Sequence, residues 1–157
     1  CLVAYNRATH ATQGKGGGIY NAGRVENCTI VSNGCTAGLT GGGVYEGPGS
    51  VTNSIIWYNR AGTVSNNLNA TTGIGYSCAP ELTDGVNGNI TGNPQFINRD
   101  QGNFRITPSS PSRDKGRSLS WLATAKDLDG NSRVLGAAVD MGAYEVMSSK
   151  GAIFQFR

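Results

Sequence analysis

The sequence predicts an all-β fold, specifically a parallel β-helix, on three observations. The 157-residue chain contains 24 glycines, and each glycine in a helix interior costs about 1 kcal/mol relative to alanine. Its β-branched and aromatic residues form short runs that end at Gly or Asn, as strands bounded by turns do. A unit of similar sequence also recurs along the first part of the chain, and such units stack to build a continuous core.

The repeat is the strongest signal in the sequence. Its matching pairs are residues 16–20 with 41–45, 24–33 with 50–59 and 1–6 with 28–33, at offsets of 25, 26 and 27 positions. Each unit contains two short strand candidates, neither of them long enough for a helix. This unit length suits one coil of a parallel β-helix, in which successive coils lie about 4.8 Å apart.

Stacked coils would place equivalent residues in columns. Asn6, Asn33 and Asn59 end their strands at one position of the unit. Asn tolerates the left-handed backbone conformation, and its amide can bond the next Asn in the stack. Ile30 and Ile56 would form a neighbouring column. The glycine triplets are expected where a neighbouring backbone approaches closely.

Three regions follow from the point at which the repeat fades. Residues 1–62 hold about two and a half coils, residues 63–107 form irregular last coils, and residues 108–157 form a cap with terminal strands. Because residue 1 aligns with Cys28 in the middle of a unit, we expect a fragment of a longer protein with further coils upstream. The alternative is a mature lipoprotein whose first cysteine is lipidated.

Local patterns predict the elements of the second half. Strands are expected at 92–98, 102–106, 139–146 and 152–156, a short helix at 118–126 and a turn at 127–131. We expect residues 108–145 to fold back over the final coils, burying Met141 and Tyr144. The alternative is a linker that leaves both side chains exposed.

Composition excludes several functions. Thirteen basic and ten acidic residues give a net charge of +3, too weak and dispersed for a nucleic-acid interface. No apolar run approaches the roughly 20 residues of a membrane span. Four cysteines without C-x-x-C spacing and a single histidine, His10, argue against a zinc site.

The repeat and the C-terminal half together resemble a known group of proteins. Gly-Gly-Gly-[Ile/Val]-Tyr and Asn-[Cys/Ser]-x-Ile-x-x-Asn are similar to right-handed parallel β-helix repeats of bacterial surface proteins. The C-terminal half resembles the terminal segment of the "choice-of-anchor" group, in residues 88–96, 102–106, 110–116, 127–133 and 139–145. The resemblance implies a right-handed, pectate-lyase-like solenoid at the bacterial cell surface or secreted, without implying an activity.

The sequence predicts no catalytic and no cofactor-binding residue. Its densest acidic set is Asp114, Asp127, Asp129, Asp140 and Glu145, and glycoside hydrolysis would need two such acids about 5–10 Å apart. We expect instead that Asp114, Asp140 and Glu145 pair with arginines such as Arg133 and fix loops.

Calcium is the one metal that the sequence suggests. Asp127, Asp129 and Asn131 have the spacing of the first three ligands of a calcium loop, and Asp140 could join them. Ser132 and Ala138 replace the Gly and Glu of an EF-hand, which excludes that motif.

The cysteines allow two pairings. Cys1 and Cys28 share a column at a spacing compatible with a disulfide, although stacked buried cysteines are commonly free thiols, the state that we favour. Cys35 and Cys78 could pair across the last turns, and the sequence does not decide between these states.

The expected function is a non-enzymatic structural or adhesive module, extracellular or at the cell surface, with a polysaccharide or another surface component as its partner. One alternative is the non-catalytic C-terminal end of a polysaccharide lyase or glycoside hydrolase whose active site lies upstream. Another is a subunit of an extracellular filament, in which coils of successive chains stack on one another.

Overall fold

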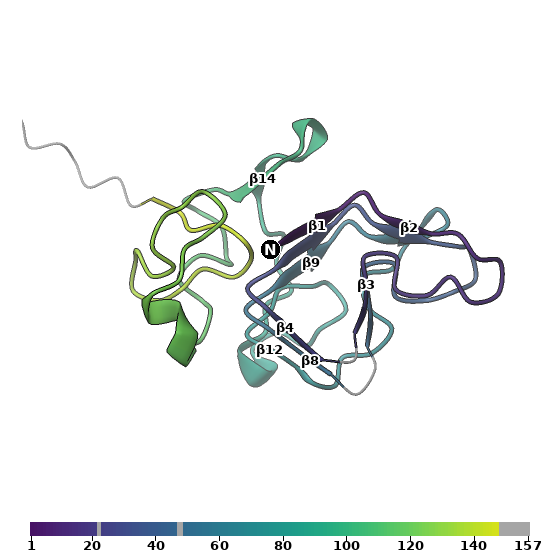
Figure 1. Cartoon of the computed structure of the whole chain (residues 1–157), viewed down its shortest axis with the longest axis horizontal. Helices are drawn as coiled ribbons and strands as arrows, with labels where there is room; N and C mark the ends of the chain where they lie inside the picture. The colour runs from purple at the N-terminus through teal and green to yellow at the C-terminus, as the bar shows by residue number, and fades with distance from the viewer. Residues whose placement is uncertain (22, 47–48, 148–157) are drawn as a thin grey trace, which may run out of the picture.

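The computed structural model describes residues 1–21, 23–46 and 49–147 (Figure 1). The strands are β1 (Leu2–Ala4), β2 (Arg7–Ala8), β3 (Ile19–Asn21), β4 (Arg24–Glu26), β5 (Thr29–Val31), β6 (Gly34–Cys35), β7 (Val44–Glu46), β8 (Ser50–Thr52), β9 (Ile55–Trp57), β10 (Arg60–Ala61), β11 (Val64–Ser65), β12 (Ile74–Gly75), β13 (Phe96–Asn98) and β14 (Asn103–Ile106). Three short 3-10 helices accompany them: η1 (Val86–Gly88), η2 (Arg99–Gln101) and η3 (Ser120–Ala123).

The strands form small sheets whose register follows the sequence repeat. Three sheets are wholly parallel, in the orders β1-β5-β9, β12-β8-β4 and β3-β7. The sheet β11-β10-β6-β2 ends in an antiparallel pair, and β13 pairs with β14 as an antiparallel hairpin. Ile30 lies opposite Ile56, so the predicted pairing of these two residues is confirmed.

The expected fold class is nevertheless wrong. The described chain is a mostly β protein of small mixed sheets with two to four strands each, and neither a right-handed parallel β-helix nor a repeat solenoid is supported. Parallel pairing is local, because after β12 the described residues contribute only isolated parallel bridges at Cys78, an isolated antiparallel bridge between Lys126 and Ser132, and the antiparallel hairpin. The alignment predicted which short segments pair, but two and a half units did not determine the architecture of the whole chain.

A ladder of asparagine side chains joins the parallel strands. The Oδ1 of Asn33 accepts from the backbone N–H of Asn6 at 3.0 Å, and the Oδ1 of Asn59 accepts from that of Asn33 at 2.9 Å. Asn67 continues the ladder to Asn59, and the carboxylate of Glu81 accepts from Asn67 at its end. Sequence reasoning missed these last two members because the 26-residue spacing does not lead to them.

The glycine triplets make room for this ladder. A Cβ on Gly43 would lie 2.6 Å from Nδ2 of Asn59, and a Cβ on Gly18 would lie 2.9 Å from Nδ2 of Asn33. Real Cβ atoms do not approach this closely, so a larger residue would displace the asparagine.

The helices and C-terminal strands differ from expectation. The helix expected at 118–126 is only the four residues of η3, and η1 and η2 were not predicted. Residues 139–146 form no strand, because their N–H groups bond side chains and distant carbonyls instead of a partner strand. The strand expected at 152–156 lies outside the described residues. Among the residues described, no helix has the length and hydrophobicity to cross a membrane.

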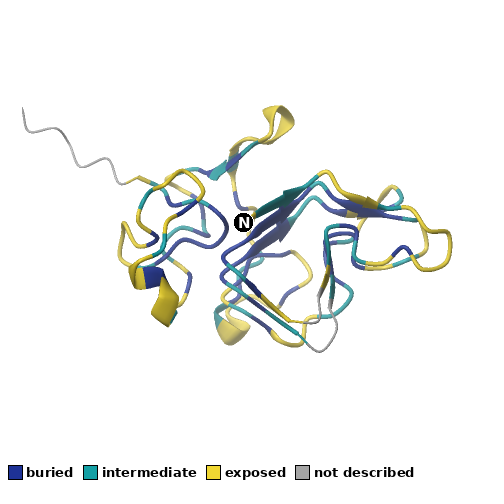
Figure 2. Ribbon diagram, viewed as in Figure 1, coloured by how far each residue is buried: buried dark blue, intermediate teal, exposed yellow. Residues whose placement is uncertain are grey.

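Two apolar clusters hold the molecule together (Figure 2). The first lies between the parallel sheets and includes Ile30, Val51 and Ile56. In the second, Met141 of the C-terminal segment packs with Ile55, and Met141 is buried while Tyr144 is half-buried. The segment thus lies beside β5 and β9 (Figure 1). It had been expected to cover the last strands instead.

Candidate functional site

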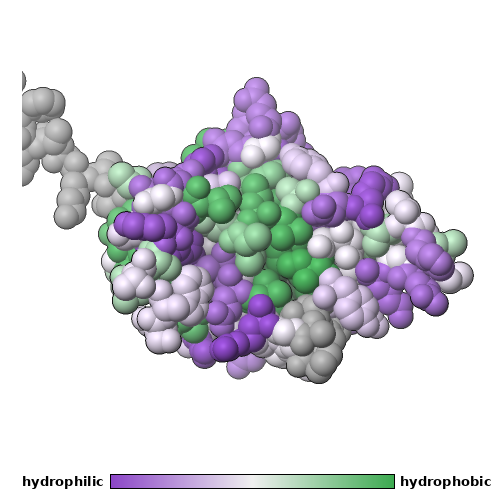
Figure 3. Space-filling view, viewed as in Figure 1, coloured by the Kyte–Doolittle hydropathy of each residue, from purple (hydrophilic) through white to green (hydrophobic). Residues whose placement is uncertain are grey.

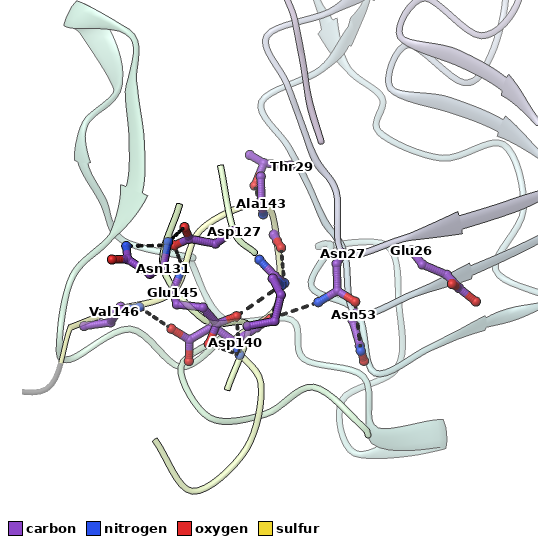
Figure 4. A network of polar contacts seen from close by, with 12 residues as sticks. Glu26, Asn27, Thr29, Asn53, Asp127, Asn131, Asp140, Ala143, Glu145 and Val146 are labelled. Atoms are coloured by element: carbon purple, nitrogen blue, oxygen red, sulfur yellow. Dashed lines mark hydrogen bonds and ion pairs between the residues drawn. The ribbon is translucent and has the colours of Figure 1, made fainter. Parts of the chain in front are cut away.

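Three of the predicted acidic residues, Asp127, Asp140 and Glu145, are buried in a polar cluster that fastens the C-terminal segment (Figure 4). Nη2 of Arg133 lies 3.3 Å from Oε1 of Glu145, and both side chains are almost fully buried. Arg133 also donates to the carbonyl of Gly142 at 2.9 Å, and the Glu145 carboxylate accepts from the N–H of Asp140. These contacts join Arg133 to residues 140–145 of the same segment.

Burial dominates the electrostatics of the cluster. It raises the pKa of Glu145 to about 8 and raises the pKa of Asp140, because a buried carboxylate loses its hydration. Burial also acts to raise the pKa of Asp127, but hydrogen bonds from the N–H groups of Glu145 and Asn131 outweigh it, and the pKa is lowered. The cluster is closed to solvent and suits fastening better than catalysis.

Hydrogen bonds link the cluster to the parallel sheets. The N–H of Gly142 donates to the carbonyl of Asn53 at 2.8 Å, and that of Ala143 donates to Oγ1 of Thr29 at 3.0 Å. Nδ2 of Asn27 donates to the carbonyl of Asp140 at 3.4 Å. The cluster therefore holds the segment against β5 and against the turns at Asn27 and Asn53.

The residues considered for calcium are engaged by other donors. Both carboxylate oxygens of Asp127 accept from donors of Asn131, at 2.8 and 3.2 Å, and Asp129 pairs with Arg105. The carboxylate of Asp140 accepts from the N–H groups of Asp114 and Val146. Within residues 1–21, 23–46 and 49–147, no group of three His, Cys, Asp or Glu side chains has the arrangement of a metal site.

The remaining predicted residues have local roles. Asp114 accepts from the N–H of Ala138 and lies 3.4 Å from Nε of Arg113. Cys1, Cys28, Cys35 and Cys78 are free thiols, and only Cys1 is exposed. Burial raises the pKa of Cys78 to about 11, which makes it a poor nucleophile at neutral pH.

A different region has the features of a binding site. We call it the arginine–tyrosine groove, an open depression of about 440 Å³. Its lining residues are Tyr5, Arg7, Ser32, Asn33, Gly34, Tyr58, Arg60, Gly62, Arg99 and Asp100. It lies between the sheet containing β2, β6 and β10 and the β13–β14 hairpin, which stands out from the body of the molecule (Figure 1).

Strand register builds this groove from the repeat. Arg7 and Arg60 both pair with Gly34, one from each side of β6. The small residues Ser32 and Gly34 therefore form a floor, and the Tyr-Asn-Arg segments on the two neighbouring strands form walls. Two strand spacings separate these walls, about 9.6 Å between backbones.

The tyrosines of the walls have strained backbones. Tyr5 has a φ of 61° and Tyr58 a φ of 59°, and Ser32 at the same position of the unit between them has a φ of 56°. This left-handed conformation, expected for the asparagine that follows in each unit, costs a residue with a Cβ roughly 1–2 kcal/mol. Strain of this kind clusters at functional sites, where the surrounding structure maintains it.

The charge of the groove is mainly positive. Arg99 lies 4.5 Å from the ring centroid of Tyr58 and donates two hydrogen bonds to Asp100. Arg7 and Arg60 are exposed, and neither has an acidic partner among the residues that the structure describes. Three guanidinium groups therefore face one carboxylate, which favours an anionic ligand.

The groove could have been found in the sequence. Tyr-Asn-Arg-Ala occurs at 5–8 and again at 58–61, and the unit between them has Ser-Asn-Gly-Cys at 32–35. The three segments align on their shared asparagine, and the residues on either side of it differ in the middle unit. That change from Tyr and Arg to Ser and Gly is the signal for a groove.

No protein-family model matches the sequence, and no curated protein or solved structure is significantly similar to it. The resemblance to β-helix surface proteins with a choice-of-anchor segment is therefore not supported and is withdrawn. The candidate site rests on the geometry of the chain itself.

Proposed function

We propose that this protein is a non-enzymatic adhesive module, extracellular or at a cell surface, that binds an acidic glycan in the arginine–tyrosine groove. The observation that carries the proposal is the position of Arg7 and Arg60 on either side of Gly34. An unpaired guanidinium binds a carboxylate or sulfate through two parallel hydrogen bonds.

The aromatic walls support a sugar as the ligand. A pyranose ring offers a face of C–H groups that packs on an aromatic ring, and its hydroxyls bond polar groups at the edge of the groove. Tyr5 is 62% exposed, so its ring is open to such contact. An aromatic body with a polar tip suits recognition at a wet surface.

The acids of the groove favour binding over cleavage. Asp100 is the one carboxylate that lines the groove, and its side chain is 81% exposed and bonded to Arg99. Hydrolysis of a glycosidic bond uses a pair of carboxyl groups with different protonation states. The groove therefore supports retention of a glycan on the surface of the protein.

A binding assay with matched variants tests the proposal. Calorimetry with a uronate oligosaccharide should show binding in this groove by the native protein, and the double variant Arg7→Gln/Arg60→Gln should bind there at least tenfold more weakly. The control Lys115→Gln/Lys126→Gln removes the same charge from exposed residues outside the groove and should bind normally. Equal weakening of binding in both double variants would show that net charge alone accounts for it, and would refute a specific binding site in the groove.

A second candidate function is a subunit of an assembly. Apolar residues gather over β1 and β4 on the face seen in Figure 3, where Val3 and Ile19 only partly cover the first apolar cluster. Among the described residues, β1 and β4 are edge strands of their sheets, and exposed edge strands can pair with strands of other chains. Light scattering over a range of concentrations should show reversible oligomers, which Val3→Lys disperses; a monomer at all concentrations would exclude this function.

A further inference from the structure

A second tyrosine groove lies at another edge of the sheets. Tyr76 follows β12 with a φ of 50°, and the register of β12, β8 and β4 aligns it with Asn53 and Asn27. These two residues also have left-handed backbones, with φ of 51° and 49°, which asparagine tolerates well. Tyrosine is less stable than asparagine in this backbone conformation, so the stability of the fold does not explain why residue 76 is a tyrosine.

The structure holds the Tyr76 ring in place from one side. A Cβ on Gly88 would lie 2.7 Å from Cδ1 of this ring, so the glycine lets the backbone lie close against it. The guanidinium carbon of Arg117 lies 5.9 Å from the ring centroid. Tyr76 remains 37% exposed, which leaves part of the ring accessible to a ligand.

Arg117 is presented by a rigid backbone. Its N–H donates to Oδ1 of Asn53 at 2.8 Å, and its carbonyl accepts from Nδ2 of the same residue at 2.8 Å. Its guanidinium has neither an ion pair nor a hydrogen-bond acceptor among residues 1–21, 23–46 and 49–147. The backbone of Arg117 is thus held in place, and its guanidinium, which forms no ion pair with the described residues, lies beside the exposed ring of Tyr76.

The space around these two residues suits a sugar unit. Tyr76 and Arg117 line a depression of about 440 Å³ together with Thr52, Gly75 and Asn87. The hydroxyl of Thr52 and the amide of Asn87 are suitable hydrogen-bond partners for sugar hydroxyls. Gly75 has no side chain that would fill the depression. An aromatic ring, an unpaired guanidinium and polar side groups are the same chemistry as in the arginine–tyrosine groove.

We infer that the Tyr76 groove is a second binding site for an acidic sugar unit and that the module is bivalent. β12 and the β13–β14 hairpin lie at opposite edges of the molecule (Figure 1), so the two grooves can engage two separate glycan chains. The ligand class rests on the proposed function, but the residues that carry this inference are different.

Binding stoichiometry tests the inference. A uronate trisaccharide should occupy two sites on the native protein and one site on either Tyr76→Asn/Arg117→Gln or Tyr58→Asn/Arg60→Gln. Asparagine suits the left-handed backbone at both positions, so the variants should keep the native circular dichroism spectrum and urea midpoint. Addition of a long polyuronate should make the native protein turbid through cross-linking and leave both one-site variants clear.

The possible failures are distinct. A native stoichiometry of one that Arg60→Gln abolishes and Arg117→Gln leaves unchanged would overturn the second site and keep the proposed function. Binding that survives Arg7→Gln/Arg60→Gln and is lost only with Arg117→Gln would overturn the arginine–tyrosine groove instead. No binding by the native protein would overturn both.

Discussion

Replacing Asn59 by alanine should destabilise the protein more than any other change in the asparagine ladder. The side chain is fully buried and makes five hydrogen bonds. It accepts from N and Nδ2 of Asn33, and it donates to Ile30 O, Trp57 O and Asn67 Oδ1, all between 2.9 and 3.1 Å. Alanine would remove all five of these bonds, although Oδ1 of Asn67 would still accept from the backbone N–H of residue 59.

The size of the effect follows from these bonds. A buried hydrogen bond contributes about 1 kcal/mol net, and a buried group left without a partner costs about 1–3 kcal/mol. With partial relaxation around the smaller side chain, we expect Asn59→Ala to lower the free energy of unfolding by about 4 kcal/mol. Such a loss is a large share of the 5–15 kcal/mol typical of a folded domain.

Asn6 provides a matched control at the exposed end of the same ladder. Its side chain donates to the carbonyl of Ala4 and to Oδ1 of Asn33, and it is exposed, so water can replace it. Asn6→Ala should therefore cost less than about 1 kcal/mol. Urea unfolding followed by circular dichroism measures both values. A cost for Asn59→Ala within about 1 kcal/mol of that for Asn6→Ala would refute the view that the ladder stabilises the fold.

Three further outcomes are expected. Glu145 has a pKa of about 8 in the folded protein against an ordinary 4.5, so between these pH values the native state holds a proton that the unfolded chain has released. The free energy of unfolding should therefore fall as pH rises from about 4.5 to 8, and urea midpoints should fall less over this range in Glu145→Gln. Tyr58→Asn should weaken glycan binding at the arginine–tyrosine groove at least tenfold in calorimetry. Its thermal midpoint should stay within a few degrees of native, because relief of backbone strain offsets the lost ring contacts, and a large drop in the midpoint would contradict this balance. Gly43→Ala should destabilise the protein by about 1–3 kcal/mol, because the new Cβ would contact Asn59. In the control Gly34→Ala the Cβ would lie 3.6 Å from its nearest neighbour, so the urea midpoint should stay near native, and equal losses in both variants would contradict the close approach at Gly43.

The sequence contained the pairing of the strands but not the architecture that they form. A 26-residue offset aligns Ile30 with Ile56 because each lies in a short apolar segment that an asparagine follows. The structure pairs these two residues. Alignment of two and a half units says nothing about the residues after β12, where pairing is limited to isolated bridges and one antiparallel hairpin. The step from local register to a solenoid, and to a protein family, therefore failed.

The sequence by itself determined that this chain is rich in short strands, which segments lie beside one another, and that glycine and asparagine mark their junctions. Only the tertiary structure decided that Glu145 and Arg133 are buried together, that the C-terminal segment lies beside β5 and β9, and that Arg99 enters the groove from a hairpin about 40 residues along the chain from Tyr58. The physical reason is that register depends on local spacing, which a repeat records. Burial, charge pairing and the meeting of distant loops depend on how the whole chain packs.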